Sequence, residues 1–191
     1  MIRPLLASLA FTLAAPAALA QEPATMIGPE VGAAAPDFFA INAETGATVM
    51  LDTITGDTGA VLVFSRSLDW CPFCKKQALD LIEATEPLAE KGWELNLITY
   101  DDPATLASYA AEKDVNYTLL SDTNSAMIDA FELRNEEMDG RGRYEGIPHP
   151  AIVFIGADGE VKAMLREEGY KDRPPVETVL ETANALADPV S

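Results

Sequence analysis

The feature that most constrains the fold is an uninterrupted apolar run at residues 59–64, Gly-Ala-Val-Leu-Val-Phe, which a proline follows closely at Pro72. A short run of this kind, rich in β-branched residues, is typical of a strand that is buried on both faces of a sheet. Proline suits the first turn of a helix because its φ is fixed and it has no N–H to satisfy. The sequence therefore predicts a central strand, a turn and a helix that begins at Pro72.

The rest of the chain continues this alternation of strands and helices. Predicted strands are residues 93–100, 117–120, 151–155 and 161–166, and predicted helices are residues 72–89 with a kink before Pro87, 103–112, a segment around 127–131, and 176–186. A hairpin turn is expected at residues 42–46, whereas residues 134–146 have no apolar periodicity and are predicted to be a loop. This order predicts an α/β fold: a three-layer α/β/α sandwich with a mixed central sheet and an N-terminal β-hairpin extension.

The N-terminus has the pattern of a secretory signal peptide. An apolar run at residues 5–19 follows Arg3, is broken by Pro16 and ends in Ala-Leu-Ala at residues 18–20. We expect a signal peptide at 1–20, a linker at 21–30, and a single compact domain at 31–191. A membrane anchor needs roughly 20 uninterrupted apolar residues, so the expected location is the periplasm of a bacterium, or outside the cell, with no stable membrane insertion after cleavage.

Charge narrows the range of partners. The chain contains 13 basic and 31 acidic residues, for a net formal charge of −18. A surface this acidic repels the phosphates of nucleic acids and of anionic lipids. The sequence therefore predicts no nucleic-acid partner, and the charge is explained most simply as a contribution to solubility.

The chemistry is expected at the only two cysteines, Cys71 and Cys74. A disulfide between them would close a very short loop, and the entropic stabilisation from a disulfide grows with loop length, so a purely structural role is weakly motivated. A structural zinc site needs four ligands, and beyond these cysteines the chain offers one histidine, His149. The prediction is a redox-active Cys71–Cys74 disulfide that uses no metal and no cofactor.

A helix start at Pro72 places Cys71 at the N-cap and Cys74 in the first turn. The free N–H groups and the dipole at a helix N-terminus stabilise a thiolate, the form that attacks disulfides. We expect Cys71 to be exposed and to act as the attacking thiol, with Cys74 as the resolving thiol and Pro72 holding the turn between them. Basic side chains from Arg66, Lys75 and Lys76 would stabilise the thiolate further, and Asp69 would destabilise it.

Three further residues are predicted to surround the cysteines. Trp70 offers either a flat rim for a partner or a packing contact. His149 lies between Pro148 and Pro150 just before a buried strand, where one of these prolines in cis would bring the backbone beside the thiols. An imidazole titrates near neutral pH, so His149 is a candidate for acid–base chemistry as well as for packing.

Together these residues resemble the thioredoxin-like superfamily, over almost the whole chain after the predicted leader. Residues 32–38 are similar to the opening of alkyl hydroperoxide reductase and thiol-specific antioxidant (AhpC/TSA) domains, and residues 119–122 to a later strand-to-helix signature of that family. Residues 70–74, Trp-Cys-Pro-Phe-Cys, are similar to the active site of thioredoxins. Pro150 stands where such families carry a cis-proline, and Pro148 is the competing candidate.

Two departures bear on the function that this resemblance implies. Peroxiredoxins have a threonine three residues before the peroxidatic cysteine. Aligning this motif with the chain makes Cys74 the peroxidatic residue and puts Cys71 in the position of the threonine, which is therefore absent. The usual arginine at the start of the late strand also has no counterpart in residues 149–151, although Arg66 could take its place from the other side.

The function predicted from the sequence is therefore an exported thiol-disulfide oxidoreductase that cycles Cys71 and Cys74, with a protein or a small molecule as its thiol or disulfide partner. The alternative is a peroxiredoxin-like antioxidant enzyme that reduces hydroperoxides. A copper-handling module ranks third, because thiolates and an imidazole suit Cu(I). A catalytically silent redoxin used for binding ranks fourth.

Overall fold

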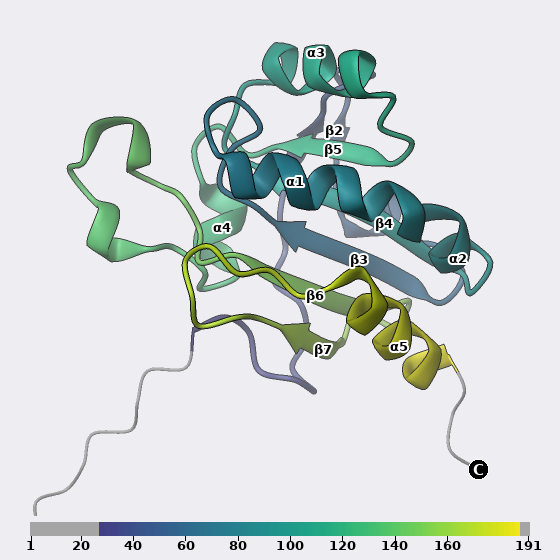
Figure 1. Cartoon of the computed structure of the whole chain (residues 1–191). Coiled ribbons are helices and arrows are strands. Elements are labelled where there is room, and N and C mark those ends of the chain that lie inside the picture. Colours follow the sequence, from purple (N-terminus) through teal and green to yellow (C-terminus); the bar gives the residue numbers. More distant parts are fainter. Residues whose placement is uncertain (1–26, 188–191) are drawn as a thin grey trace, which may run out of the picture.

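A computed structural model describes residues 27–187, which form one seven-stranded mixed sheet with helices on both faces (Figure 1). The order of strands across the sheet is β2-β1-β5-β4-β3-β6-β7. The strands are β1 (Ala40–Asn42), β2 (Thr48–Val49), β3 (Gly59–Phe64), β4 (Trp93–Thr99), β5 (Thr118–Ser121), β6 (Ala151–Gly156) and β7 (Val161–Leu165). The predicted signal peptide and most of the predicted linker lie outside the described residues.

The apolar run at residues 59–64 is β3, the central strand of the sheet. β3 pairs in parallel with β4 and antiparallel with β6, and every residue of β3 and β6 is buried. The alternating side chains of β3 feed two separate cores, since Val61 and Val63 pack on one face while Leu62 and Phe64 pack on the other. A strand that must satisfy two cores has no polar face, which explains its continuous hydrophobicity.

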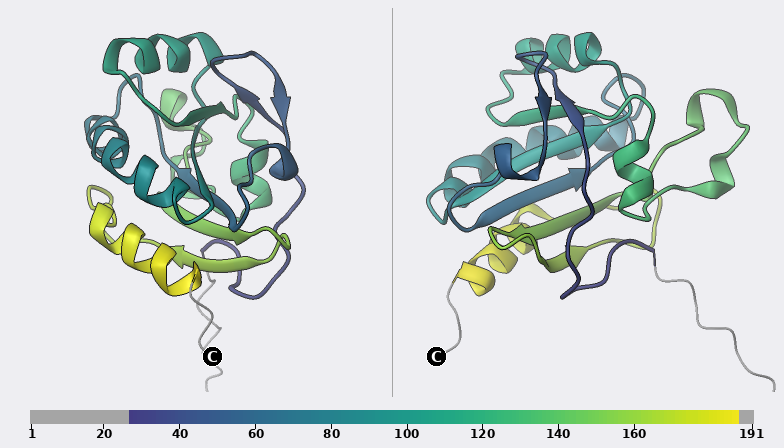
Figure 2. Two further views of the ribbon diagram at one scale, coloured as in Figure 1. Left: turned by 90° about the vertical axis from the view of Figure 1, so that its right-hand side faces the viewer. Right: turned by 180° about the vertical axis from the view of Figure 1, so that it is seen from behind.

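The helices are divided unequally between the two faces of the sheet (Figure 2). They are α1 (Pro72–Asp80), α2 (Thr85–Ala89), α3 (Pro103–Lys113), α4 (Ala126–Ala130) and α5 (Val176–Ala187). α1, α2, α3 and α5 contribute to the core that contains Val61, whereas α4 contributes to the core that contains Leu62. The predicted three-layer α/β/α sandwich with a mixed sheet is confirmed.

The predicted hairpin extension is also present, as β1 and β2 at the edge of the sheet next to β5. Its turn is held by Asn42, whose Oδ1 accepts the N–H groups of Glu44 and Thr45, both at 3.0 Å. Gly46 closes the turn with a φ of +71°, a conformation that glycine adopts without strain.

One predicted helix is divided in the structure, and the predicted loop contains two short helical turns. The helix expected over residues 72–89 is interrupted by a 3-10 turn, η2 (Leu81–Ala84), and α2 begins at Thr85. Pro87 thereby falls in the first turn of α2, where its missing N–H leaves no hydrogen bond unmade. The segment at residues 134–146 is a loop as predicted, with two short 3-10 turns, η3 (Glu136–Met138) and η4 (Gly142–Tyr144).

The last residues of the predicted linker pack against the domain. Ile27 contacts the core that contains Leu62, and the Gly28 N–H donates to the Glu132 carbonyl oxygen at 3.0 Å. Within residues 27–187, no helix has both the length and the apolarity needed to cross a membrane.

The start of β3 yields a test of the packing. A Cβ on Gly59 would overlap the Ile155 carbonyl oxygen and would lie 2.5 Å from a ring atom of Trp93. Because neither the paired backbone nor the buried indole can move away freely, Gly59→Ala should lower the free energy of unfolding by about 3 kcal/mol. Chemical denaturation measures this loss.

Gly46→Ala is the matched control for this substitution. It adds the same methyl group at a position with no atom within 4 Å, so its cost is limited to the strain of a positive φ, about 1 kcal/mol. An equal loss of stability in the two variants would contradict the close packing at the start of β3.

Candidate active site

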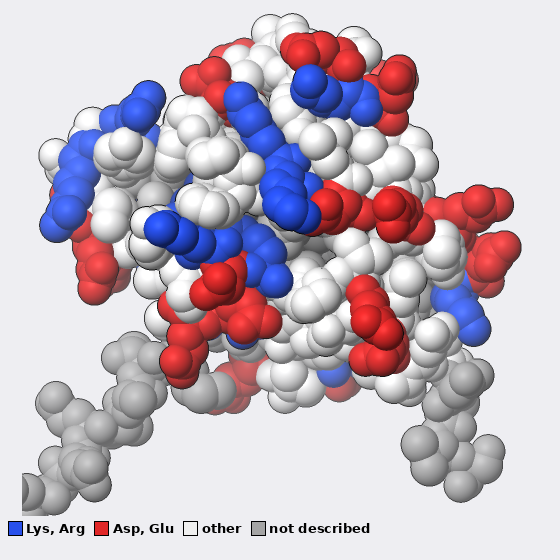
Figure 3. Space-filling view, viewed as in Figure 1, with Lys and Arg blue, Asp and Glu red and all other residues white. Residues whose placement is uncertain are grey.

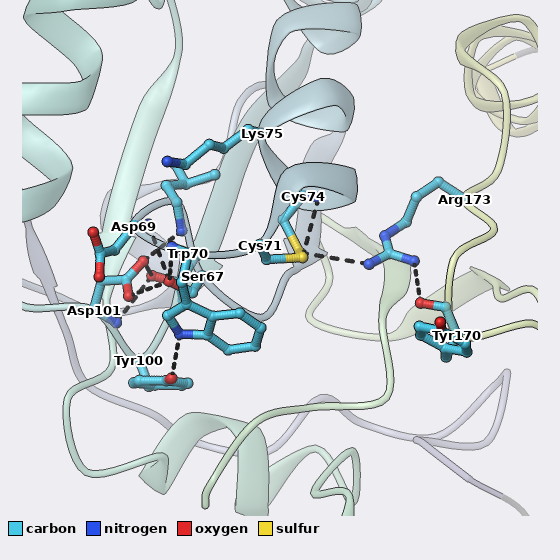
Figure 4. Close-up of a disulfide and its surroundings, with 12 residues drawn as sticks. Ser67, Asp69, Trp70, Cys71, Cys74, Lys75, Tyr100, Asp101, Tyr170 and Arg173 are labelled. Carbon is cyan, nitrogen blue, oxygen red and sulfur yellow. Dashed lines mark hydrogen bonds between the residues drawn. A yellow bond between two sulfur atoms is a disulfide. The ribbon is translucent and has the colours of Figure 1, made fainter. Parts of the chain in front are cut away.

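The two cysteines form a disulfide at the N-terminus of α1, directly after the central strand (Figure 4). Cys71 is the N-cap residue, Pro72 occupies the first helical position, and the Cα atoms of Cys71 and Cys74 are 5.3 Å apart. The Cys74 N–H donates to Cys71 Sγ at 3.3 Å. The predicted placement of the cysteines at the helix start is thus confirmed, and one free N–H group of the helix points at a sulfur.

The turn that delivers Cys71 is held by a buried carboxylate at the end of β4. Asp101 accepts hydrogen bonds from Ser67 Oγ at 2.7 Å, from the Leu68 N–H at 2.6 Å and from Thr99 Oγ1 at 2.9 Å. Ser67 Oγ in turn accepts the Trp70 N–H at 3.3 Å. Hydrogen bonds to a charged group are among the stronger ones in proteins, so this network fixes the backbone entering the site.

Both sulfurs are enclosed in the disulfide form. Cys71 is 2% exposed and Cys74 is fully buried. The expectation that Cys71 is the exposed thiol is therefore wrong for this state, because both cysteines belong to the core that contains Val61, and Trp70 and Phe73 pack against that core. Each of these two rings is in turn covered by a tyrosine from another segment. A molecule that reacts with either sulfur must pass these covers.

The first cover lies over Trp70 and comes from the loop at residues 134–146. Trp70 Nε1 donates to the Tyr100 hydroxyl at 2.8 Å, and that hydroxyl donates to the carbonyl oxygen of Arg143. The ring of Tyr144 meets the indole edge-on, with centroids 5.0 Å apart. Burial raises the pKa of Tyr100. Trp70 is thus a packing residue that ties the loop to the active site.

The second cover lies over Phe73 and comes from the segment before α5. The ring of Tyr170 meets Phe73 edge-on at 6.3 Å, and Lys171 Nζ lies 5.9 Å from the centroid of Phe73. The guanidinium carbon of Arg66 is 5.8 Å from the centroid of Tyr170. The segment before α5 therefore carries both apolar and cationic groups to the disulfide.

Arg173 from the same segment contacts a sulfur. Its Nη2 lies 3.5 Å from Cys74 Sγ, while Nη1 donates to the carbonyl oxygens of Tyr170 at 3.3 Å and Asp172 at 2.6 Å. Burial and the charge of Arg66 lower the pKa of Arg173 to about 10, against a smaller opposing effect of Asp172. No carboxylate of the described residues forms an ion pair with Arg173, so its charge is directed at the sulfur.

Arg66 is the second cation at the site and also lacks a counter-ion among residues 27–187. It is 9% exposed, its Nε has no hydrogen-bond partner in the described chain, and burial lowers its pKa. The lysines contribute less, since Lys75 points away from the disulfide in Figure 4 and Lys76 pairs with Asp80 at 2.6 Å. One buried and one half-buried guanidinium group without an anion are costly, and a thiolate formed on reduction would offset that cost.

The region around His149 differs from the prediction. All peptide bonds within residues 27–187 are trans, so the expectation of a cis bond at Pro148 or Pro150 is wrong. This stretch instead runs extended against an earlier segment: Pro148 bridges Arg134, and the His149 N–H donates to the Leu133 carbonyl oxygen at 2.7 Å.

The side chain of His149 does not form a metal-binding group with the two cysteines. It is half-buried and lines a surface groove with acidic residues that include Asp129 and Glu137. Burial, together with the charges of Arg166 and Arg66, lowers its pKa, so the neutral imidazole is favoured. No three His, Cys, Asp or Glu side chains within residues 27–187 are arranged to hold a metal ion. In the described residues, a copper ion at the two sulfurs would therefore not have His149 as a third ligand.

Sequence reasoning missed Arg173, Tyr170, Tyr100 and Asp101. Arg173 and Cys74 are 99 positions apart, and no motif links them. The available signal was compositional: Lys171 and Arg173 stand together in a strongly acidic chain, immediately before the two prolines that precede α5. Of the candidates that sequence reasoning did name, the structure places Trp70 and Pro72 next to the disulfide and Arg66 against Tyr170, in the segment that carries Arg173.

The chain is similar to known proteins along most of its length. The model of the AhpC/TSA family matches residues 31–164. Peroxiredoxin Bcp of Escherichia coli is 28% identical over 124 residues, which cover 65% of this chain and 78% of that protein. A putative peroxiredoxin of the same kind from Haemophilus influenzae is 28% identical over 142 residues, which cover 74% and 89%.

Solved structures show the same fold. Peroxidoxin BcpB from Mycobacterium tuberculosis superposes with a TM-score of 0.70 at 22% identity, covering 84% of this chain and 98% of that one. Peroxiredoxin Q from Xanthomonas campestris gives a TM-score of 0.68 at 21% identity, covering 83% and 97%. With a cysteine pair at the start of α1 and a matching family model over most of its length, the chain belongs to the AhpC/TSA family, as a thioredoxin-fold oxidoreductase that acts on thiols.

Proposed function

We propose that the protein is a thiol peroxidase in which Cys74 attacks a hydroperoxide and Cys71 resolves the oxidised sulfur. The observation that carries this proposal is the contact between Arg173 and Cys74 Sγ at 3.5 Å. It reverses the roles expected for a disulfide exchanger, in which Cys71 attacks, and agrees with the peroxiredoxin alignment, which makes Cys74 the peroxidatic residue.

The electrostatics of the two sulfurs favour Cys74 as the thiolate. Two opposite unit charges about 4 Å apart attract each other by roughly 4 kcal/mol at the effective dielectric constant of about 20 that suits partly buried sites. The helix N-terminus next to Cys71 contributes at most about 2 kcal/mol. Since the Arg173 guanidinium contacts Cys74 and Arg66 lies nearby, we infer that Cys74 has the lower pKa of the two thiols.

The reaction follows from this assignment. The Cys74 thiolate attacks one oxygen of the hydroperoxide, the O–O bond breaks, and the alkoxide or hydroxide leaves as an alcohol or water after protonation. Cys74 becomes a sulfenic acid. The Cys71 thiolate then attacks Cys74 Sγ and releases water once the departing hydroxide is protonated. The two thiols have supplied two electrons, and the product is the Cys71–Cys74 disulfide seen in the structure.

The two departures from peroxiredoxins fit this scheme. The position of the missing threonine is occupied by Cys71, the N-cap residue of α1, and its sulfur is bonded to Cys74 in the first turn of the same helix. The late-strand arginine is replaced by Arg173, which approaches Cys74 from the segment before α5. The site thus retains a cation at the reactive sulfur, although it comes from another part of the chain.

The relatives support the peroxidase over a general disulfide exchanger. The similar proteins from Escherichia coli and Haemophilus influenzae carry the name peroxiredoxin. A similar structure from Xanthomonas campestris is described in terms of alkyl peroxide reduction activity, at a TM-score of 0.66. Both sulfurs are also enclosed in this chain, and an enclosed pair suits a small oxidant better than a protein disulfide.

Single cysteine substitutions separate the two functions. Cys74→Ser should abolish hydroperoxide consumption, because the attacking thiolate is lost. Cys71→Ser should still form one sulfenic acid per chain, which a dimedone probe and mass spectrometry detect at Cys74, but it should form no intramolecular disulfide. If Cys71→Ser instead abolishes oxidation by peroxide while Cys74→Ser retains it, the proposed roles are wrong.

Arg173→Gln tests the origin of the reactivity. A positive charge stabilises the thiolate and lowers the pKa of the thiol, so its removal should raise the pKa of Cys74 toward the ordinary value of about 8.5. The rate of peroxide reduction at pH 6 should fall by at least about tenfold, with partial recovery as the pH rises through that value. Lys75→Gln, which removes a cation that points away from the sulfurs, is the control and should leave the pH profile unchanged. Identical profiles for Arg173→Gln and the unmodified protein would exclude this role.

A further inference from the structure

We propose that the groove beside Cys74 binds a small, peptide-like thiol that carries a carboxylate, and that this thiol reduces the Cys71–Cys74 disulfide. The inference deepens the proposed function and rests on it, since a peroxidase that ends each cycle as a disulfide needs an electron donor. The groove lies between α1 and the segment before α5, with a volume of about 490 Å³.

The groove leads to the buried disulfide. The wall of the groove includes Phe73, the aromatic residue next to Cys74. It also includes Arg173, whose guanidinium contacts Cys74 Sγ. The disulfide itself is almost fully enclosed, with Cys71 2% exposed and Cys74 not exposed. A donor of a few residues' size that lies in the groove contacts Phe73 and Arg173, the two wall residues next to Cys74.

A polar side chain in the wall is left without a partner. Gln77 lies one turn after Cys74 on α1, is 5% exposed, and has no hydrogen-bond partner for its Oε1 among the described residues. A buried acceptor without a donor costs free energy, and the cost is removed by a ligand N–H. The amide N–H of a peptide-like molecule is such a donor.

The charges of the groove suit a ligand with a carboxylate near its thiol. Cations lie on the side next to Cys74, where Lys171 and Arg173 belong to the segment before α5 and Lys76 to α1. The acidic residues of the wall are Asp172, beside Arg173, and Asp80 and Glu83 farther along the helical side. Lys76 is already paired with Asp80 at 2.6 Å, so the free cations are those of the segment before α5. A ligand with a carboxylate at that end, and an ammonium at the other, complements both sides.

The surface around the site would guide such an anion. The chain carries a net formal charge of −18, yet on the face shown in Figure 3 basic side chains gather toward the left, where α1 begins. A local cluster of one sign on a surface of the opposite sign directs charged molecules to that cluster. An anionic thiol is therefore repelled by most of the molecule and attracted at the disulfide.

The reduction balances with two equivalents of the donor thiol. The first donor thiolate attacks Cys74 Sγ, forms a mixed disulfide with it and releases Cys71 as a thiolate, which the Cys74 N–H at 3.3 Å stabilises. A second donor thiolate attacks the donor sulfur of the mixed disulfide, which forms the donor disulfide and releases the Cys74 thiolate beside Arg173. Two donor thiols are oxidised, the protein disulfide is reduced to two thiols, and the two donor protons are accounted for by the cysteines and solvent.

The test compares two monothiols on the full-length oxidised protein in the absence of peroxide. Glutathione, a peptide thiol with two carboxylates, and 2-mercaptoethanol, which is neutral, are each mixed with the protein over a range of concentrations. Alkylation and mass spectrometry follow the loss of the disulfide. We expect the rate with glutathione to saturate and the rate with 2-mercaptoethanol to rise linearly. A linear dependence on glutathione would overturn the proposal.

Two matched lysine substitutions locate the site. Lys171→Gln removes a groove cation and should raise the half-saturating concentration of glutathione by roughly fivefold, the effect of losing one partly exposed ion pair. Lys75→Gln removes the same charge from α1 outside the groove and should change it by less than about twofold. Equal effects of both substitutions would show general attraction without a binding site and would overturn the proposal. Unchanged rates with 2-mercaptoethanol in both variants show that the disulfide itself is unaltered.

A separate assay distinguishes an error in the proposed donor site from an error in the proposed peroxidase activity. Hydroperoxide consumption is measured separately with dithiothreitol, a neutral dithiol. Peroxide turnover with dithiothreitol, combined with linear kinetics for glutathione, would overturn the donor site and leave the peroxidase intact. Saturation by glutathione without any peroxide turnover would instead show that the groove recognises the thiol while the proposed peroxidase is wrong, and the inference as stated would fall with it.

Discussion

The contact between the Arg173 guanidinium and Cys74 Sγ is the interaction on which the proposed function depends. A disulfide carries no charge, so in the oxidised state the partly buried guanidinium of Arg173 lies beside neutral sulfur, with the charge of Arg66 close enough to lower its pKa further. Reduction supplies the missing negative charge at Cys74. In the proposed function the same arrangement stabilises the reduced protein and makes Cys74 a better nucleophile, because both effects come from stabilising one thiolate.

The covers over the disulfide depend on two segments that are far from the cysteines in sequence. The loop at residues 134–146 closes over Trp70 through Tyr100 and Tyr144, and the segment before α5 closes over Phe73 through Tyr170. Excluding water strengthens the electrostatic attraction between Arg173 and the sulfur. It also restricts access, so that the size and charge of a reactant determine whether it reaches Cys74.

The sequence predicts the scaffold of the site better than its electrostatics. The central strand, the helix start at Pro72 and the N-cap position of Cys71 follow from local patterns, and the structure has all three. Arg173 could not be assigned, because its contact joins residues 99 positions apart and depends on how the last segment packs on α1. The expected exposure of Cys71 and the expected cis-proline were wrong for a similar reason: both were set by tertiary contacts that no local motif encodes.

The proposed function requires that Cys74, and not Cys71, is the thiolate at neutral pH. The most direct test is to reduce the protein and measure the rate of iodoacetamide alkylation at each cysteine, by peptide mass spectrometry, between pH 4 and pH 10. We expect Cys74 to react first, and its rate to reach half its maximum at a pH well below the ordinary thiol pKa of about 8.5. Faster alkylation of Cys71 at low pH, or an unshifted titration of Cys74, would contradict it.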